Sequence, residues 1–501
     1  MSSSDEMSID PANNNNDDDD GKQQTKIRVS FHLSPSVRQN RHQLELPSEP
    51  MAVPSNIRKR GLSAIVNHLL DRGDTTHNDN SDDDDEEDQE RPPAIPFDFL
   101  LNDKLLRLPL DSAARTHGLS TEHALELYYF PARLPPKKEG ESEQLFDWIM
   151  CLEYNTVENR LLCGGADGVI RTFEQRGKEE KEEGGELRSG CVISAHTGPI
   201  KCMSSLTDDD SMTYIATGSM DQTLVTHTYN SKKDEMSLHA VYSGGHGNSI
   251  SSVALAGSDG KRIMASGDWD GGLAIWNVPG SNDDGDGDTI GSKASKKRKD
   301  NNSKSTSSSN EVVGAAIQEV QPIQSVRAHS SNISGLAWGY NSSTTTLPTT
   351  LLTGSWDHGL KVYDISRMDC ILALNGSRVV TSLSRCSNSD VVATGSPDCT
   401  VRLWDMRTNG DGTSGSQIAD KTLRQSHKSW VSAVQWSPTD PFVLATTSHD
   451  GTLKVWDIRS SLPLHTVKAT TNKGDKSLCL AFGDGFIYSG GSDCVVKKFA
   501  L

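Results

Sequence analysis

The feature that most constrains this chain is one short pattern, which occurs seven times in its C-terminal two thirds. Each copy has small residues, then an aspartate, an aliphatic residue three positions later and a ring-bearing residue six positions later. The aspartates are Asp167, Asp221, Asp270, Asp357, Asp398, Asp450 and Asp493. Because two side-chain classes keep two fixed distances in every copy, we expect one structural unit that is repeated seven times.

Each copy predicts a turn followed by a strand. Small residues allow a tight bend, the aspartate accepts hydrogen bonds from the backbone of the turn, and the alternating apolar run pairs into a sheet. A histidine precedes four of the aspartates by 23 to 28 residues: His196, His246, His329 and His427. The first, fifth and seventh copies have no such histidine.

The pattern resembles the WD-repeat family, in which this histidine and this aspartate join a hydrogen-bond network within each blade of a propeller. The resemblance implies an all-β, seven-bladed WD-repeat propeller over residues 147–501. It also implies structural roles for the repeated aspartates and histidines rather than roles in metal binding or acid–base catalysis. The last copy ends two residues before Leu501, so residues around 131–146 are predicted to supply the outermost strand of the last blade and cover its open edge.

A low-complexity stretch at 281–311 interrupts the repeats. It accounts for the spacing of 87 residues between Asp270 and Asp357, against a usual repeat of about 40–45 residues. Its Gly, Asp, Ser and Lys content predicts a disordered loop between blades three and four. The loop holds a basic cluster that is a candidate nuclear import signal or a sequence-blind phosphate contact, the alternative being an ordinary solubilising loop: Lys296, Lys297, Arg298 and Lys299.

A small α+β domain is predicted at residues 25–131, after a disordered acidic tail at 1–24. The runs KIRVSFHL and QLELP alternate as strands, RGLSAIVNHLLDR has helical spacing, and strand, short helix and strand follow. This order suggests a β-grasp, the ubiquitin-like arrangement, with an acidic insertion at 74–92 in a surface loop. Residues 132–146 are predicted to be a linker.

The strings RKRGLSAIVNHLL, PFDFLLNDKLLRLPL and GLSTEHALELYY are similar to the ubiquitin-like NLE domain of the WD-repeat protein twelve family. That family comprises ribosome-biogenesis factors partnered with Pescadillo and the Block-of-proliferation protein, and it is related to Notchless. The resemblance extends from about Lys26 to Leu501. It implies a nuclear, nucleolar and nucleoplasmic assembly factor of the pre-ribosomal particle of the large subunit, required for maturation of the large-subunit and 5.8S rRNAs.

The same resemblance assigns a partner to each domain. The propeller is expected to bind the Block-of-proliferation and Pescadillo proteins, and the ubiquitin-like domain is expected to bind the midasin AAA ATPase, which releases the factor. In the family an acidic residue of this domain contacts a metal-ion-dependent adhesion site on midasin, and the matching position is Glu122. A partner carboxylate suits Mg²⁺, which favours oxygen ligands. From the residues alone, Glu122 is an ordinary solvated side chain.

Motifs for catalysis and for bound metals are missing from the sequence. Asp283, Asp284, Asp286 and Asp288 superficially resemble a calcium loop, but the sixth position from Asp284 is Thr289 rather than glycine. A Walker A lysine, H-E-x-x-H and G-x-S-x-G are all lacking. We therefore expect no enzyme activity, no cofactor and no metal bound by this chain alone.

Charge and cysteine content indicate protein partners inside the cell. Lys and Arg total 50 against 68 Asp and Glu, a net charge of −18, so any contact with rRNA is expected to be local. The nine cysteines show no C-x-x-C spacing, which predicts reduced thiols. A secretory signal is not expected at the N-terminus, and the chain has no apolar stretch that predicts a membrane span.

A rival hypothesis from another functional class is a substrate receptor of a cullin-RING ubiquitin ligase. Two segments fit the W-D-x-R pattern with which some such receptors bind their adaptor, and they end at Arg407 and Arg459. The pattern is weak support, because W-D closes strands in any WD-repeat.

Overall fold

The computed structural model describes residues 25–37, 41–72, 92–174, 187–208, 212–258, 260–280, 318–339, 347–376, 378–406, 421–423 and 426–501. The predicted acidic tail at 1–24, nearly all of the acidic insertion at 74–92 and the whole basic loop at 281–311 lie outside these ranges. The chain divides into two units, Met1–Arg133 and Leu134–Leu501. None of the helices in the described ranges is both long enough and apolar enough to cross a bilayer.

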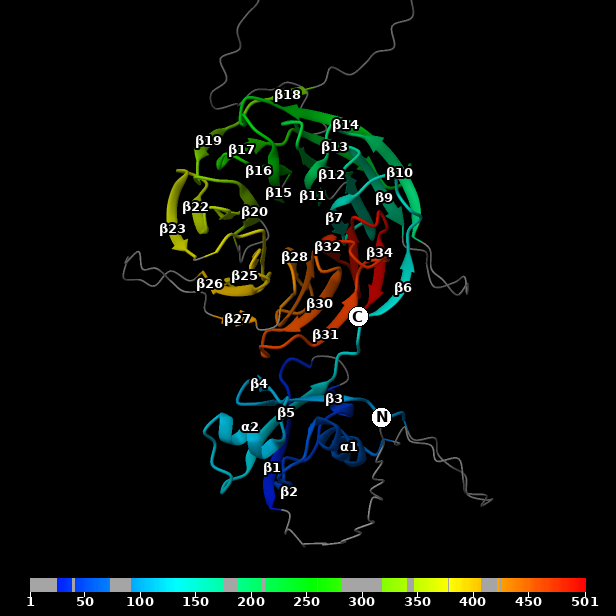
Figure 1. Ribbon diagram of the computed structural model, residues 1–501, viewed down its shortest axis with the longest axis vertical. Coiled ribbons are helices and arrows are strands. Elements are labelled where there is room, and N and C mark those ends of the chain that lie inside the picture. Colours follow the sequence, from blue (N-terminus) through cyan, green and yellow to red (C-terminus); the bar gives the residue numbers. More distant parts are fainter. Residues whose placement is uncertain are drawn as a thin grey trace, which may run out of the picture. The chain divides into compact units, whose positions relative to one another are not determined.

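The first unit contains a five-stranded sheet with the order β2-β1-β5-β3-β4 (Figure 1). Its two central strands, β1 and β5, run parallel, and the other neighbours are antiparallel. The strands are β1 (Lys26–Leu33), β2 (Met51–Pro54), β3 (Phe97–Leu101), β4 (Lys104–Leu105) and β5 (Leu125–Pro131). The helices are η1 (Arg41–Gln43), α1 (Lys59–Leu69) and α2 (Leu110–Thr116).

Helix α1 covers this sheet through one apolar face. Leu62 and Val66, one helical turn apart, are fully buried in the same core as Phe97 and Tyr129. Asn67 fixes the end of the helix to the chain before β3, because its side-chain amide donates to Ile95 O (2.8 Å) and its oxygen accepts from Ile95 N (2.9 Å). The predicted helical run therefore forms the helix, with its spacing intact.

The prediction that QLELP forms a strand is wrong. Gln43 ends the short helix η1, and the second strand of the domain is β2, several residues further on. The segment is held instead by one buried hydroxyl: Tyr129 Oη donates to Leu44 O (2.5 Å) and accepts from Leu46 N (3.1 Å). Alternating Leu44 and Leu46 pack on the core without a strand partner, so alternation alone misidentified the element.

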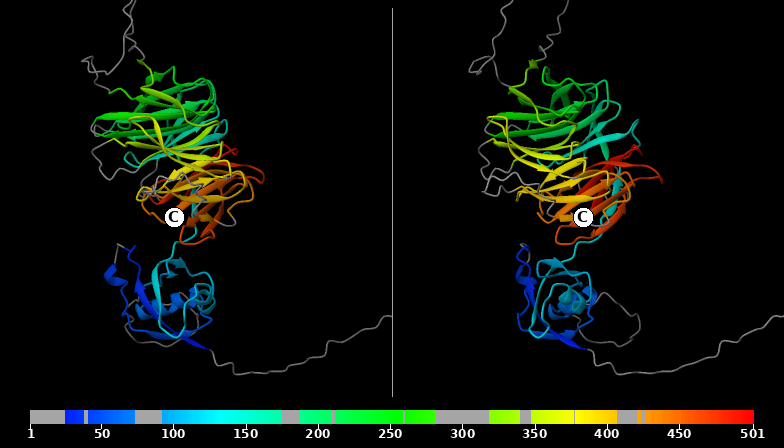
Figure 2. Two further views of the ribbon diagram at one scale, coloured as in Figure 1. Left: turned by 90° about the vertical axis from the view of Figure 1, so that its left-hand side faces the viewer. Right: turned by 60° about the vertical axis from the view of Figure 1, so that its left-hand side comes forward.

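The second unit contains seven sheets, arranged around a central axis as in a β-propeller (Figures 1 and 2). We number them from first to seventh in chain order. The first is β7 (Ile149–Asn155), β8 (Arg160–Gly165), β9 (Val169–Glu174) and β10 (Arg188–Ser194). The second is β11 (Ile200–Thr207), β12 (Met212–Ser219), β13 (Leu224–Asn230) and β14 (Glu235–Tyr242), with β18 (Gln318–Val320) added at its outer edge. The third is β15 (Ile250–Ser258), β16 (Lys261–Asp268), β17 (Gly272–Asn277) and β19 (Gln324–Arg327).

The remaining four sheets have four strands each. The fourth is β20 (Ile333–Trp338), β21 (Thr350–Ser355), β22 (Gly359–Asp364) and β23 (Asp369–Asn375). The fifth is β24 (Ser382–Arg385), β25 (Val391–Gly395), β26 (Val401–Asp405) and β27 (Lys421–Leu423). The sixth is β28 (Val431–Trp436), β29 (Val443–Ser448), β30 (Thr452–Asp457) and β31 (His465–Lys468). The seventh is β32 (Ser477–Phe482), β33 (Phe486–Gly491), β34 (Lys497–Ala500) and β6 (Lys137–Glu141).

The outer strand of the seventh sheet comes from far upstream in the chain. Strand β6 pairs antiparallel with β34, from Glu141 opposite Lys497 to Lys137 opposite Ala500. Ser142 extends the pairing, because its N–H donates to Val496 O (2.8 Å) and its Oγ accepts from Val496 N (3.0 Å). In Figure 1 the two strands lie side by side at the edge of the ring. The last sheet thereby reaches four strands and its edge is covered.

The long low-complexity stretch enters the propeller at a different place from the one predicted. We expected it between the third and fourth blades, but it follows β17 and precedes β19, the fourth strand of the third sheet. On the way back the chain first forms β18, which pairs parallel with β14 of the second sheet. The aspartate spacing could not show this, because an insertion anywhere between two turns lengthens the spacing equally.

Deleting residues 137–141 from the full chain should lower the thermal unfolding midpoint, because it leaves the N–H and C=O groups of β34 without partners. Each backbone hydrogen bond that is lost costs about 0.5–1.5 kcal/mol, because the freed groups can bind water instead. The exposed edge should also cause self-association that increases with concentration. Differential scanning calorimetry and light scattering measure the two effects. Deleting residues 301–305 is the control, and equal behaviour of the two deletions would contradict a closing role for β6.

Candidate functional site

Each repeated aspartate stands in the turn between the second and third strands of its sheet. The residue after the aspartate has a positive φ in all seven turns: Gly168, Gln222, Gly271, His358, Cys399, Gly451 and Cys494. At Gly168 an added Cβ would lie 2.3 Å from His196 O, so the turn also brings the backbone of the next loop close. Glycine adopts this conformation without steric cost, whereas the four other residues need support from hydrogen bonds.

In the fourth sheet the expected histidine and aspartate are in contact. His329 Nδ1 lies 3.0 Å from both carboxylate oxygens of Asp357, and its Nε2 lies 2.8 Å from Thr353 Oγ1. Burial lowers the pKa of His329 and outweighs the opposing effect of Asp357. The imidazole is therefore neutral at neutral pH and serves as a hydrogen-bond bridge rather than as a charge.

The second and sixth sheets repeat this contact with longer distances. His196 Nδ1 and His427 Nδ1 each lie 3.3 Å from their aspartates, Asp221 and Asp450. Burial acts to raise the pKa of Asp221, but hydrogen bonds from Thr223 and the other donors outweigh it and lower that pKa to about 2. In the sixth sheet the chain of contacts continues from His427 through Thr446 to the indole of Trp456.

The third sheet uses a different aspartate from the predicted one. His246 Nδ1 contacts Asp268 Oδ2 (2.9 Å), and Asp268 Oδ1 accepts from the backbone N–H of Asp270 (3.0 Å) and of Gly272 (2.7 Å). Asp270 itself is exposed and accepts from Asn248 Nδ2 (3.1 Å). Asp268 occupies the position where other copies have a serine, such as Ser355. Its carboxylate therefore accepts the hydrogen bonds of the turn and contacts the histidine in place of Asp270.

The three copies without a histidine pair their aspartate with a basic residue four positions later. Arg171 forms two hydrogen bonds with Asp167 (3.2 and 2.6 Å). Arg402 does the same with Asp398 (3.3 and 2.5 Å). In the seventh sheet Lys497 Nζ lies 2.5 Å from Asp493 Oδ2 and also donates to Ala469 O (3.0 Å), with only 4% of its side chain exposed.

Sequence reasoning missed these pairs, although a signal was present. The copies DGVIR, DCTVR and DCVVK, which lack the histidine, each have Arg or Lys at the fourth position after the aspartate. The histidine-bearing copies DHGLK and DGTLK also have Lys there, so this signal identifies the pairs only together with the missing histidine. A buried carboxylate without a partner is costly, and a cation across the turn compensates for it as the imidazole does elsewhere. In all seven turns an aspartate is therefore paired either with an imidazole or with an Arg or Lys side chain.

The inner strands of the seven sheets surround a cavity of about 790 Å³. The inner strands of six sheets, all but the fifth, carry a β-bulge at their second residue. A bulge re-aims its side chain, and these side chains line the cavity, together with Thr381 at the corresponding place in the fifth sheet. We call these residues the bulge ring: Met150, Lys201, Ser251, Ser334, Thr381, Ser432 and Leu478.

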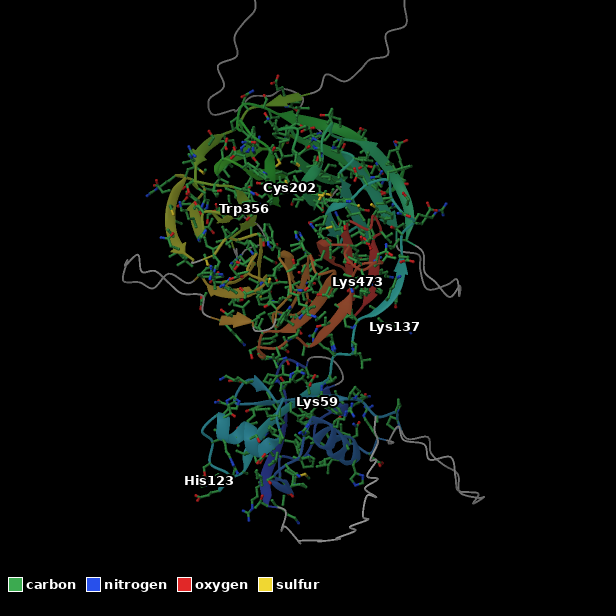
Figure 3. All side chains as sticks on the ribbon, in the orientation of Figure 1. Lys59, His123, Lys137, Cys202, Trp356 and Lys473 are labelled. Atoms are coloured by element: carbon green, nitrogen blue, oxygen red, sulfur yellow. The ribbon has the colours of Figure 1, made fainter. Side chains whose placement is uncertain are left out.

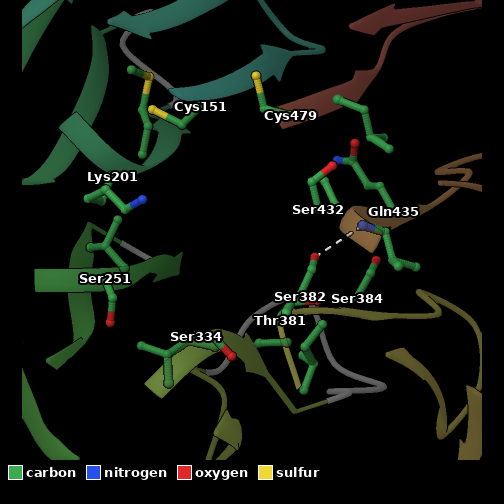
Figure 4. Close-up of a pocket in the computed structure, with 18 of the residues that line it drawn as sticks. Cys151, Lys201, Ser251, Ser334, Thr381, Ser382, Ser384, Ser432, Gln435 and Cys479 are labelled. Atoms are coloured by element: carbon green, nitrogen blue, oxygen red, sulfur yellow. Dashed lines mark hydrogen bonds between the residues drawn. The ribbon is translucent and has the colours of Figure 1, made fainter. Parts of the chain in front are cut away.

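The hydroxyl groups of the bulge ring connect neighbouring sheets. Ser251 donates to Ile333 O (2.7 Å) and Ser334 donates to Val380 O (2.5 Å). Thr381 donates to Val431 O (2.6 Å), and Ser432 donates to Ser477 O (2.7 Å). Figure 4 shows these side chains around the cavity. They hold the third to seventh sheets together at the centre of the ring.

Large apolar side chains are exposed on the face of the propeller that carries the aspartate turns. Trp148, Trp269 and Trp430 are 48%, 39% and 48% exposed. Trp269 packs against Trp356 at 5.7 Å between ring centroids, and Trp430 stacks on His449 at 5.9 Å. Figure 3 labels Trp356 near the central opening. Exposed aromatic rings of this kind are typical of protein-binding surfaces.

The predicted metal-contact residue Glu122 lies in a bend just before β5. Its side chain is exposed, and its backbone N–H donates to Ser120 Oγ at 3.3 Å. Among the described residues its carboxylate makes no hydrogen bond or ion pair. The position is thus accessible to a partner, and an ordinary solvated side chain would have the same geometry.

Other predicted features have a structural explanation or lie outside the described residues. The basic cluster Lys296–Lys299 is among the latter, as is Arg407. Arg459 is engaged, because it donates twice to Asp457 (2.9 and 2.6 Å) and lies over the Phe442 ring. Within the described ranges no group of three or more His, Cys, Asp or Glu could hold a metal ion.

All nine cysteines are free thiols. Burial raises the pKa of Cys151 to about 12, which keeps this thiol protonated and unreactive.

Comparisons with known proteins match both units. The NLE (NUC135) domain model matches residues 37–114. The model of the WD domain, G-beta repeat matches residues 188–225, 237–277, 320–364, 368–405 and 420–457. The chain is therefore a WD-repeat protein with an N-terminal NLE domain, and the prediction of a WD-repeat propeller is confirmed.

Relatives extend over almost the whole chain. A ribosome biogenesis protein WDR12 homolog of Chlamydomonas reinhardtii is 30% identical over 479 residues, covering 91% of this chain and 94% of the relative. The homologs of Oryza sativa and Arabidopsis thaliana are 28% and 27% identical, with 90% of this chain and 92% of each relative covered. The chain belongs to the family of ribosome biogenesis proteins WDR12, as the sequence resemblance predicted.

The buried histidines predict how stability depends on pH. Burial holds the pKa of His427 below its unfolded value of about 6.5, so its contribution is fully present above that pH and is lost as the pH falls through the folded pKa. We expect His427→Gln to cost about 1–3 kcal/mol at neutral pH, because Thr446 and Asp450 lose their partner. The cost should shrink toward about pH 5, because at that pH the buried, unprotonated imidazole lowers the free energy of unfolding of the wild type itself.

Urea unfolding of both proteins at several pH values measures this difference. His123→Gln is the matched control, because His123 is an exposed residue of the first unit (Figure 3). A cost for His427→Gln that is the same at every pH would show that the imidazole is not held neutral.

Proposed function

We propose that this protein is a non-catalytic assembly factor of the large ribosomal subunit, required for pre-rRNA processing. The observation that carries the proposal is the match of relatives named ribosome biogenesis proteins over nine tenths of the chain. Its two units give it two separate binding parts, a propeller and an NLE domain. Such a protein acts by holding partners together.

The architecture proposed for this role has a seven-bladed propeller and a ubiquitin-like domain. Each of the seven sheets is one blade, with β6 as the outer strand of the last blade. The small domain occupies residues 25–131, where parallel central strands and a helix across the sheet suit a β-grasp. Residues 132–146 connect the domains and carry β6 within them.

The propeller is the part proposed to bind the Block-of-proliferation and Pescadillo proteins and the pre-ribosomal particle. Its exposed tryptophans on the turn face support this assignment, since buried aromatic anchors dominate the energy of protein interfaces. Any contact with rRNA is local in this proposal, because the chain carries a net charge of −18 and affinity for a phosphate backbone comes from Lys and Arg.

Glu122 is the residue proposed to contact the metal-ion-dependent adhesion site of midasin. Its carboxylate is exposed in a bend of the first unit and has no competing partner among the described residues. A carboxylate oxygen can complete the coordination of a hard cation such as Mg²⁺ that a partner holds. Engagement of this residue would let midasin release the factor from the particle.

The protein is proposed to work in the nucleus, nucleolus and nucleoplasm, where large-subunit precursors mature. Lys296, Lys297, Arg298 and Lys299 are the candidate import signal for that location.

The rival function as a ligase substrate receptor is not retained. Arg459, the W-D-x-R arginine that lies within the described residues, is only 12% exposed and is bound to Asp457, so a role within the sixth sheet explains this copy of the motif.

Glu122→Ala should weaken binding of the purified full-length protein to the adhesion domain of midasin in the presence of Mg²⁺. Loss of one metal ligand removes the directional bond of the interface, and we expect at least a tenfold weaker complex, about 1.4 kcal/mol or more. Calorimetric titration measures the affinity. Glu126→Ala, which removes another exposed carboxylate four residues away in β5, is the matched control. Unchanged affinity of the Glu122 variant would refute the proposed contact.

Replacing Lys296, Lys297, Arg298 and Lys299 by alanine should shift a fluorescent fusion of the protein from the nucleus to the cytoplasm. Import receptors read clustered basic side chains, so removal of the four charges removes the recognition element. The control replaces two isolated lysines on either side of the cluster, Lys293 and Lys304, by alanine. This control lowers the charge of the same stretch but leaves the cluster intact. A nuclear signal that persists in the fourfold variant would eliminate the cluster as the import element.

A further inference from the structure

The bulge ring contains one charged side chain, Lys201. Four members of the ring are hydroxyl residues whose donors are used by carbonyl groups of the neighbouring sheets, and Met150 and Leu478 are apolar. Lys201 makes no hydrogen bond or ion pair with any described residue. Figure 4 shows its side chain directed into the cavity. It is therefore the member of the ring whose polar group is left for a ligand.

The surroundings of Lys201 do not compensate its charge. The neighbouring thiol of Cys151 is neutral, because burial raises its pKa to about 12. Glu153 lies further along β7 and accepts from the backbone N–H of Ser205, and burial raises its pKa to about 7. Burial lowers the pKa of Lys201 as well. Desolvation without a partner destabilises an ammonium group, and a carboxylate brought to it would remove that cost.

Aromatic side chains line the same cavity from two sides. Trp269 and Trp356 contact each other across the third and fourth sheets, and Trp430 stacks on His449 in the sixth. Trp269 and Trp430 are also exposed to solvent, so they stand at a mouth of the cavity. A segment that enters between them would find apolar walls before it reaches the ammonium group.

Exposed lysines add positive charge beside Trp430. Lys428 follows His427, and Lys473 and Lys476 belong to the loop before β32. Lys476 is close enough to act on His449, whose pKa is lowered first by burial and then by this lysine. None of the three lysine side chains forms an ion pair with the described residues. Figure 3 labels Lys473 over the seventh sheet, further from the central opening than Trp356.

We propose that the propeller takes an acidic side chain of a protein partner into its central cavity, where Lys201 is the ion-pair partner and Trp269, Trp356 and Trp430 hold the flanking apolar residues. The occupant is an acidic, partly apolar peptide segment. This inference rests on the proposed function, because it defines the chemistry of the partner segment that the turn face binds. Charge complementarity and the two aromatic pairs select this occupant.

A polynucleotide fits the same observations less well. Affinity for a phosphate backbone grows with the number of cations along its path. The exposed lysines of this face are confined to the loops on one side, beside Trp430, and the bulge ring adds a single ammonium group. The turn face also carries exposed carboxylates at Asp147 and Asp270, which would repel successive phosphates. A single carboxylate needs only one cation and a desolvated position, and Lys201 supplies both.

The test is a selection of short random-sequence peptides on the purified full-length protein, followed by affinity measurements on the enriched peptides by fluorescence anisotropy. Enriched peptides should carry Asp or Glu beside aromatic or aliphatic residues. Lys201→Met should weaken their binding about tenfold or more, the loss expected for one charge-assisted hydrogen bond. Lys201→Arg should retain most of the affinity.

Lys232→Met is the matched control, because Lys232 is exposed in the turn between β13 and β14 and does not line the cavity. Enriched peptides without acidic residues, or acidic peptides that bind Lys201→Met as tightly as wild type, would overturn the inference. So would a single-stranded oligouridine that binds in a Lys201-dependent way while acidic peptides do not bind. A folding defect is distinguished by the thermal unfolding midpoint, which should be unchanged or higher in Lys201→Met.

Failure of the inference and failure of the proposed function give different results. Co-sedimentation of the wild-type protein with large-subunit precursors tests the proposed function by itself. If the protein co-sediments but the peptide selection shows no role for Lys201, the inference alone is wrong. If the wild-type protein does not co-sediment, the proposed function is wrong whatever the peptides show.

Discussion

Closure of the ring of sheets is the constraint on which the rest of this propeller depends. Strand β6 and Ser142 complete the seventh sheet through the backbone of β34 and Val496. Next to this closure, Cys479 Sγ lies 3.6 Å from Ile149 O, across the junction of the seventh and first sheets. The hydroxyl links of the bulge ring join the third to the seventh sheets around the same centre. The central cavity, with Lys201 in it, is enclosed because the inner strands of all seven sheets surround it.

A second general property is that the turns tolerate different chemistry as long as the buried aspartate is compensated. His329 bridges Asp357 to Thr353, whereas Arg171 and Lys497 neutralise their aspartates directly. The first route couples the turn to the interior of the sheet through a neutral ring, and the second couples it to the next strand through a charge. The sheets can thus diverge in sequence without losing the turn.

Sequence reasoning predicted the features that depend on short-range pattern. The aspartate register located the turns, and the spacing around Leu62 and Val66 located helix α1, because both follow from local backbone geometry. It failed where a contact between distant residues decides the outcome. Tyr129 binds the backbone of the QLELP segment, which forms no strand. His246 contacts Asp268 instead of the predicted Asp270. No sequence pattern marks Lys201 as a candidate site residue. That its ammonium group has no partner depends on the side chains that six other inner strands place around the cavity.

The origin of β6 has a consequence for how this protein is made. Among the strands of the propeller, translation delivers β6 first and β34 last, and 354 positions separate Ser142 from its partner Val496. Until the ribosome has finished the seventh sheet, the nascent chain carries an unpaired closing strand at one end and an open sheet edge at the other. Contacts between such distant residues form slowly, and open edges invite pairing with other chains. Synthesis of the propeller therefore includes a period in which both edges are exposed.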